Sequence, residues 1–173
     1  MIKILGIKVT DRIKEVGITQ EVLSKHASMI TTRMGFHELT TEVCSREAYI
    51  ILHLNGEEAD YDHLVKDLSS IGGVEIREMD FSKKVKESRK TEKGTIRILG
   101  LLVEREHDLV IAVQKLLTAY GCVIRTRLGV NETFFGKPAG LIILELKGDE
   151  AQMNLLEHDL LALKKVHLRK MIF

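Results

Sequence analysis

Apolar residues along the chain follow two alternating patterns: short continuous runs, and longer stretches whose apolar positions lie three or four residues apart. The runs at residues 2–9 and 96–103 are rich in isoleucine, leucine and valine, which is typical of central β-strands. In the second half, helical spacing predicts one buried helix face: Leu109, Val113, Leu116, Leu117 and Tyr120. The matching stretch of the first half is less regular, and we place Val16, Leu23 and Ala27 on its buried face.

The expected elements follow the order β-α-β-β-α-β, twice. Strands are predicted at residues 2–9, 29–36, 48–54 and 74–79, and again at 96–103, 122–130, 141–146 and 166–173. The second helix of each half has its own apolar positions: Leu64, Leu68 and Ile71, then Met153, Leu156, Leu160 and Leu163. Gly72 and Gly73 are expected to cap the first of these two helices. This order predicts the α+β class, as two tandem ferredoxin-like modules with antiparallel sheets and both helices on one face.

The two halves align with each other at a nearly constant offset. Lys3 falls on Arg97, an offset of 94 (97 − 3), and the same offset pairs Arg33 with Arg127. After one loop the offset becomes 92, because Gly56 falls on Gly148 (148 − 56). We therefore predict one module at residues 1–81, a charged linker at 82–94 and a second copy of the module at 95–173.

Several central strands are apolar at consecutive positions, so both faces of each sheet are expected to be covered. The runs at residues 50–52 and 141–144 show this most clearly. We expect the other module or a second chain to supply the cover, which predicts a homo-oligomer formed by sheet packing or by edge pairing. The linker is basic but has no aromatic residue to stack on bases, so nucleic acid is not an expected partner.

The composition and the lack of known catalytic motifs limit the classes of function that we expect for this protein. The 173 residues are 45% hydrophobic and 29% charged, with a formal net charge of +1 and two cysteines. These values are typical of a globular protein of a reducing compartment, and we expect a cytoplasmic protein without membrane segments. The sequence has no phosphate-binding glycine loop, nucleophile elbow or zinc-spaced ligand pairs. We therefore expect no enzyme and no cofactor.

Two segments resemble a known family. Ile4-Leu5-Gly6-Ile7, together with Thr32-Arg33-Met34-Gly35-Phe36, is similar to the regulators of the iron-only hydrogenase system. These are small ferredoxin-like proteins related to ACT domains and to the C-terminal domain of nickel-responsive repressors. The resemblance implies a regulatory or ligand-sensing module that oligomerises through its sheets. The tandem duplication departs from the single copy typical of that family.

The turn after the first strand is one candidate ligand site. Thr10, Asp11 and Arg12 resemble the start of the ACT helix, where ACT domains hold amino acids at an interface between modules. Backbone N–H groups at a helix N-terminus also favour a carboxylate ligand. The alternative is a plain helix cap.

A second candidate is the Arg-x-Gly motif that both copies share. Arg33 with Gly35, and Arg127 with Gly129, can supply a guanidinium and a close backbone approach to an anionic ligand. The alternative is a salt bridge beside a β-bulge.

Metal binding is a third candidate, confined to the first copy. His26, His37 and Cys44 offer nitrogen and sulfur ligands, and nickel-responsive repressors use a His-x-His motif followed by a cysteine. One histidine of that pair is missing here, so scattered surface histidines are the alternative. Cys44 also lies close to Arg46 in sequence, which favours a reactive thiolate, whereas we expect Cys122 to be buried.

These observations predict a non-enzymatic regulatory protein, linked to hydrogenase or metal metabolism, that senses an amino acid or another small anion at module interfaces. One alternative is a ligand-free interaction scaffold, and another is a metal sensor that uses His37 and Cys44. Because Thr10, Asp11, His37 and Cys44 do not recur in the second copy, special chemistry is expected in the first.

Overall fold

The computed structural model describes residues 2–37, 45–81, 96–134 and 136–173. The chain divides into two compact units, residues 1–83 and 84–173, and each is described by itself. The predicted linker at residues 82–94 lies outside the described residues. No helix in the described ranges is both long and apolar enough to cross a membrane.

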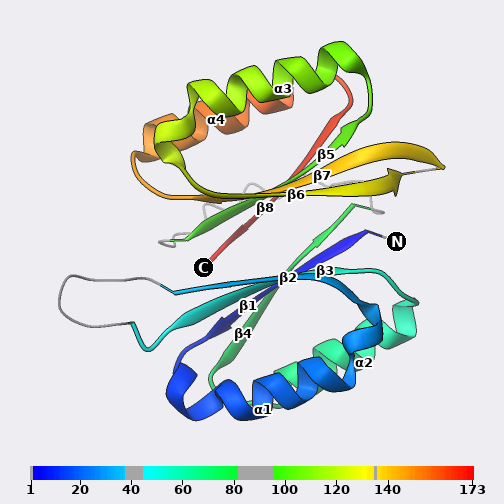
Figure 1. The fold of residues 1–173 in the computed structure, drawn as a ribbon. Coiled ribbons are helices and arrows are strands. Elements are labelled where there is room, and N and C mark those ends of the chain that lie inside the picture. The colour runs from blue at the N-terminus through cyan, green and yellow to red at the C-terminus, as the bar shows by residue number, and fades with distance from the viewer. Residues whose placement is uncertain (1, 38–44, 82–95, 135) are drawn as a thin grey trace. The chain divides into compact units, whose positions relative to one another are not determined.

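The first unit is a four-stranded antiparallel sheet with two helices on one face (Figure 1). Its elements are β1 (Lys3–Val9), α1 (Arg12–Lys25), the short 3₁₀ helix η1 (Ala27–Met29), β2 (Ile30–Phe36), β3 (Ala48–Leu54), α2 (Glu58–Ser69) and β4 (Val74–Asp80). The strand order β2-β3-β1-β4 places β1 and β3 in the middle, as the apolar runs predict. This is the ferredoxin-like arrangement, so the predicted fold class is confirmed.

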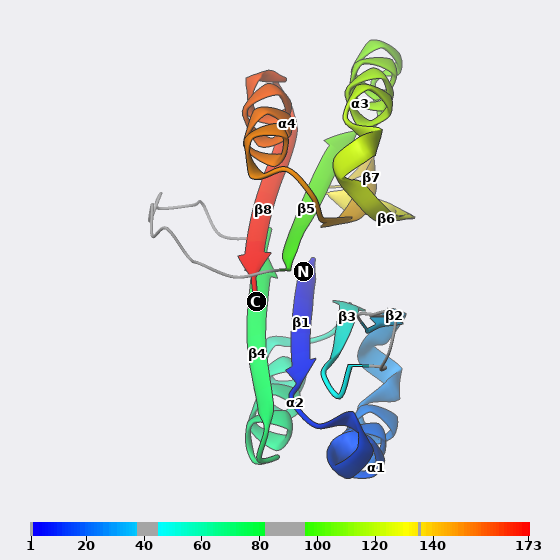
Figure 2. The same cartoon turned by 90° about the vertical axis from the view of Figure 1, so that its left-hand side faces the viewer.

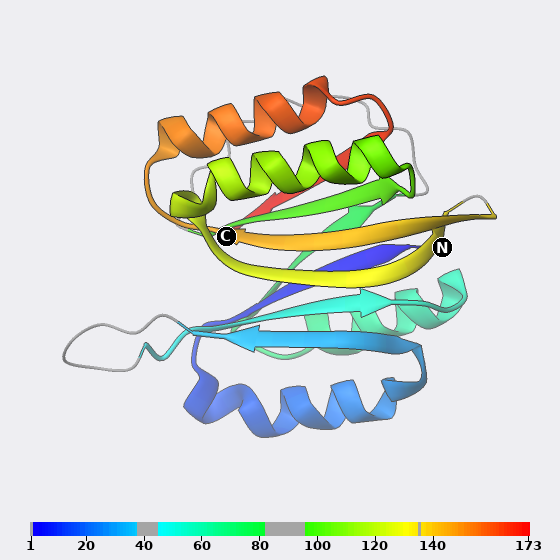
Figure 3. The same ribbon diagram turned by 45° about the horizontal axis from the view of Figure 1, so that its top comes forward.

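The second unit repeats this architecture. Its elements are β5 (Arg97–Glu104), α3 (His107–Ala119), η2 (Gly121–Val123), β6 (Ile124–Phe134), β7 (Lys137–Leu146), α4 (Glu150–Ala162) and β8 (Val166–Ile172), and the strand order is β6-β7-β5-β8. Helices α3 and α4 lie side by side on one face of the sheet (Figures 2 and 3). Strands β6 and β7 are both longer than predicted and form an extended hairpin.

Each unit has a core between its sheet and its helices. In the second unit, alternate β5 residues pack against the helices at Leu99, Leu101 and Val103. All five positions of the predicted α3 face belong to this core, so that prediction is confirmed. The apolar positions predicted for α2 and α4 also lie in the two cores.

The predicted face of α1 was largely wrong. The helix buries Glu15, Thr19 and Leu23, which lie four residues apart, whereas Val16 is 56% exposed and Ala27 lies exposed in η1. A search for apolar spacing missed this face because only Leu23 on it is strongly apolar.

The glycine pair after α2 also acts differently from the prediction. The helix ends at Ser69 with Ser70 as its C-cap, before either glycine. Gly73 instead makes the turn into β4 with a φ of 78°. Its carbonyl oxygen accepts hydrogen bonds from both the backbone N–H and the hydroxyl of Thr10, at 2.8 and 3.0 Å.

Candidate functional site

A groove of about 220 Å³ lies in the second unit, along the edge of the sheet beneath α3. Residues from the end of β5, from α3 and from the β6–β7 hairpin line it. This volume is far above the space that one water molecule needs, so the groove is large enough for a small organic ligand.

Two glycines, Gly129 and Gly140, leave room for this groove because they have no side chain. On β6, Gly129 follows Arg127 on the side of the strand that faces α3, and on β7 Gly140 pairs with Asn131. A Cβ atom added at either Gly129 or Gly140 would meet no atom within 4 Å. The two glycines therefore leave open volume that side chains fill elsewhere on the sheet.

The polar groups of the groove are cationic or neutral. Arg127 donates from Nη1 to the side-chain oxygen of Gln114 at 2.9 Å, and Arg105 donates from Nη2 to the side-chain oxygen of Asn131. No lining residue is acidic. Within the described part of the chain, neither guanidinium forms an ion pair with a carboxylate. The groove thus holds two positive charges that are hydrogen-bonded but not neutralised.

The shared Arg-x-Gly motif has the same local role in both units. In the first unit Arg33 donates from Nη1 to Gln20 at 2.6 Å, the counterpart of the bond from Arg127 to Gln114. The expected partner was an acid, but an amide of the first helix takes its place in both copies. The register shifts of β2 and β6 lie at residues 30–32 and 124–126 rather than at the glycines, so the expected bulge is displaced from the motif.

The candidate turn of the first unit is occupied by its own side chains. The Asp11 carboxylate caps α1, accepting from the N–H groups of Ile13 and Lys14 at 3.2 and 3.4 Å. Arg46 donates to the same carboxylate at 2.7 Å, while the N–H of Arg12 donates to the Arg46 carbonyl at 2.8 Å. Desolvation opposes ionisation of Asp11, but the bonds from Arg46 and Lys14 outweigh it, and the pKa of Asp11 is lowered. A ligand carboxylate would have to displace this cap.

The structure describes two of the three predicted metal ligands, His26 and His37. The Nε2–H of His26 donates to a carboxylate oxygen of Asp67 at 2.9 Å, and the hydrogen bonds from His26 and then Lys25 lower the pKa of Asp67 to about 2. His37 is described, whereas Cys44 lies outside the described residues. In those residues no group of three histidine, cysteine, aspartate or glutamate side chains is arranged to hold a metal.

Cys122 was predicted to be buried, and this was wrong. It lies exposed in η2, whose only buried residue is Val123. The apolar pattern places both Cys122 and Val123 in a strand. The strand in fact begins two residues later than predicted, at Ile124, so Cys122 lies before it.

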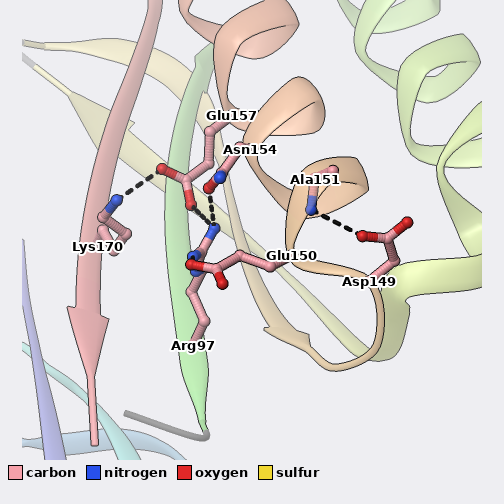
Figure 4. Close-up of polar contacts among 7 residues, drawn as sticks. All are labelled: Arg97, Asp149, Glu150, Ala151, Asn154, Glu157 and Lys170. Atoms are coloured by element: carbon pink, nitrogen blue, oxygen red, sulfur yellow. Dashed lines mark hydrogen bonds and ion pairs between the residues drawn. The ribbon is translucent and has the colours of Figure 1, made fainter. Parts of the chain in front are cut away.

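A second polar cluster of the second unit is fully paired (Figure 4). Arg97 on β5 donates to Glu157 on α4 at 2.7 Å and to Asn154 at 2.8 Å. Glu157 also accepts from Lys170 on β8 at 2.8 Å. This network ties α4 to the sheet. It is a structural element, because its cations are neutralised, in contrast to the arginines of the groove.

Sequence reasoning identified Arg127 and Gly129 but missed three other groove residues: Arg105, Asn131 and Gly140. Glu104 and Glu106 flank Arg105 in the sequence, and two acidic neighbours argue against an anion site at this turn. Glu106, however, pairs with Lys165. The signal available in the sequence was the glycine of the β7 strand, whose counterpart in the first copy is Ala48.

Comparisons with known proteins do not assign this chain to a family. No family model matches the chain, and no curated protein matches it. Among solved structures, an uncharacterised protein from Thermotoga maritima is 28% identical over 45% of this chain and 92% of its own, with a TM-score of 0.40. The acetolactate synthase small subunit from Thermotoga maritima is 12% identical, covering 99% of this chain and 93% of its own, with a TM-score of 0.37. A candidate transcriptional repressor of the glycine cleavage system is 9% identical, covering 99% of this chain and 98% of its own, with a TM-score of 0.37.

All three TM-scores lie below 0.5. The ferredoxin-like assignment therefore rests on the strand order and helix placement of the two units, which are βαββαβ modules with antiparallel sheets.

Proposed function

We propose that this chain is a non-enzymatic regulatory protein whose second unit binds a small anionic molecule in the groove beneath α3. The observation that carries the proposal is the pair of guanidiniums, Arg105 and Arg127, in a lined groove without an acid. Such groups attract and orient carboxylate or phosphate ligands.

The chemistry of the lining supports binding rather than catalysis. Its side chains are arginines, amides and aliphatic residues, with glycine backbone between them. None of these supplies a nucleophile or a general acid–base group that titrates near neutral pH. The family resemblance makes amino acids one class of ligand to test, and through the same resemblance the proposal includes a role in hydrogenase or metal metabolism.

The same proposal includes two properties of the whole chain. Homo-oligomerisation through sheet faces or edges is expected from the apolar strands, and light scattering at two protein concentrations tests it. The exposed thiol of Cys122 forms no disulfide, which supports a reducing compartment such as the cytoplasm.

A thermal-shift screen with a groove-filling variant tests the binding proposal. The panel contains amino acids, aliphatic carboxylates, inorganic phosphate, nucleotides and divalent metals. A ligand at about 100 times its Kd stabilises the native state by about 2.7 kcal/mol, which is a measurable rise in Tm. The variant is Gly129→Val, whose side chain enters the open volume of the groove.

The repeat offers a matched control at the equivalent position of the first unit. Gly35→Val places a side chain whose Cβ makes only an ordinary contact, 3.9 Å from the Tyr49 carbonyl oxygen. We expect a ligand-induced shift in the native protein and in Gly35→Val, and no shift in Gly129→Val. A flat panel, or a shift that Gly129→Val retains, contradicts binding in this groove.

A further inference from the structure

We infer that the groove is selective for a small aliphatic carboxylate without an ammonium group, and that only the second unit binds it. This inference rests on the proposed function and specifies its ligand class and its stoichiometry.

The charges of the groove exclude an ammonium group. Arg105 and Arg127 are both cationic, and the lining residues include no aspartate or glutamate. The two side-chain amide oxygens, on Gln114 and Asn131, already accept hydrogen bonds from these arginines. An α-amino acid would place its ammonium group close to two like charges and without a carboxylate partner, whereas a simple carboxylate meets only attraction.

The rest of the lining favours an aliphatic chain. Val103, Val113 and Ile142 are buried and form an aliphatic wall, and Val110 lines the groove with 38% of its surface exposed. Branched side chains of this kind are stiff, so the wall is held in place before a ligand enters. Inorganic phosphate would satisfy the arginines but would leave this apolar surface uncovered.

The first unit replaces the features that attract the anion. At the offset of 94 residues Asp11 aligns with Arg105 (105 − 11), and the Asp11 carboxylate caps α1 and accepts a hydrogen bond from Arg46 at 2.7 Å. Thr19 stands in the place of Val113 at the same offset (113 − 19). At the offset of 92, Ala48 takes the place of Gly140 (140 − 48).

In the first unit the Asp11 carboxylate therefore already pairs with the cation of this turn, Arg46, whereas in the second unit Arg105 has no carboxylate partner among the described residues. Both units keep the fold and the Arg–Gln hydrogen bond, but only in the first unit does a carboxylate of the chain pair with the arginine of the turn. We therefore place the ligand in the second unit, whereas the sequence alone predicts special chemistry in the first.

Isothermal titration calorimetry on the full chain tests both parts with three probes. 4-Methylpentanoate is the aliphatic carboxylate, leucine is the same skeleton with an ammonium group, and inorganic phosphate is the anion without a chain. We expect 4-methylpentanoate to bind with one site per chain, leucine to bind at least tenfold more weakly, and phosphate to show no saturable binding.

Charge-removing variants assign the binding to the groove. Arg105→Met and Arg127→Met should each weaken binding of 4-methylpentanoate about tenfold or more, the usual loss for a hydrogen bond to a charged group. The matched control Arg33→Met, at the equivalent position of the first unit, should leave the affinity unchanged. Arg127→Lys keeps a charge, so partial retention of binding separates charge loss from misfolding, and far-UV circular dichroism checks the fold of each variant.

The outcomes separate this inference from the proposed function. Equal or tighter binding of leucine overturns the ligand class, and two sites per chain, or loss of binding in Arg33→Met, overturns the assignment to one unit. If 4-methylpentanoate does not bind while another compound of the screening panel does so in a Gly129→Val-sensitive manner, only this inference fails. If no compound binds in that manner, both fail.

Discussion

Two arginines of the second unit, Arg97 and Arg127, have different kinds of partner. Removal of Arg97 should therefore lower stability, whereas removal of Arg127 should mainly weaken ligand binding. Arg97 is 11% exposed at its side chain and is paired with the equally buried Glu157. Arg127 is exposed and bonded to an amide. We predict that Arg97→Met destabilises the second unit strongly, whereas Arg127→Met leaves its stability almost unchanged.

The size of the first effect follows from what Arg97 leaves behind. Breaking a buried ion pair costs about 3–5 kcal/mol because the remaining charge loses its partner. Glu157 keeps Lys170 at 2.8 Å as a partner, so we expect a loss at or just below the lower end of this range, about 2–3 kcal/mol. In a unit of this size, a loss of 2 kcal/mol lowers Tm by roughly 8–16 °C. Arg127→Met should cost less than about 1 kcal/mol, the usual value of one exposed hydrogen bond.

Hydrogen exchange followed by mass spectrometry measures both variants in the full chain. Peptides from α4 and β8 report the second unit, and peptides from β1 serve as an internal reference for the first. The double variant Arg97→Met with Glu157→Leu should recover part of the loss, because no buried charge is then left unpaired. A cost below about 0.5 kcal/mol for Arg97→Met, or an equal cost for Arg127→Met, would refute the assigned roles.

Two further predictions concern the first unit. Gly73→Ala should cost about 2 kcal/mol, because φ is +78° and the new Cβ would lie 2.7 Å from the Thr10 hydroxyl oxygen. The neighbouring Gly72→Ala, where a Cβ meets nothing within 4 Å, should stay within about 0.5 kcal/mol of the parent in urea unfolding. Asp67 has its pKa lowered to about 2, so its contribution is present above the unfolded-state value near 3.9 and is lost as pH falls toward 2. The stability difference between the native chain and Asp67→Asn should therefore shrink between about pH 4 and pH 2, and a difference that is constant across this window would rule the effect out.

Sequence periodicity determined the elements, their order and their duplication. The apolar runs located the central strands, and Ala48–Leu54 matches β3 at both ends. The five predicted positions of the α3 face pack against the core, with Val113 and Leu117 buried, because helical spacing of large apolar residues allows one orientation on a sheet. Where the buried face is polar, as at Glu15 and Thr19 of α1, the same reasoning selected the wrong side.

The candidate site depended on contacts that only the tertiary structure decided. The repeat identified Arg127 and Gly129 because both copies retain the motif. Arg105 and Gly140 have no such signal, since their counterparts are Asp11 and Ala48.

The register of the β6–β7 hairpin pairs Asn131 with Gly140, and the end of β5 brings Arg105 to Asn131. Local periodicity specifies which face of an element is apolar. It does not specify the strand register, and it does not specify which side chains from distant segments come into contact. The groove depends on the register and on these contacts.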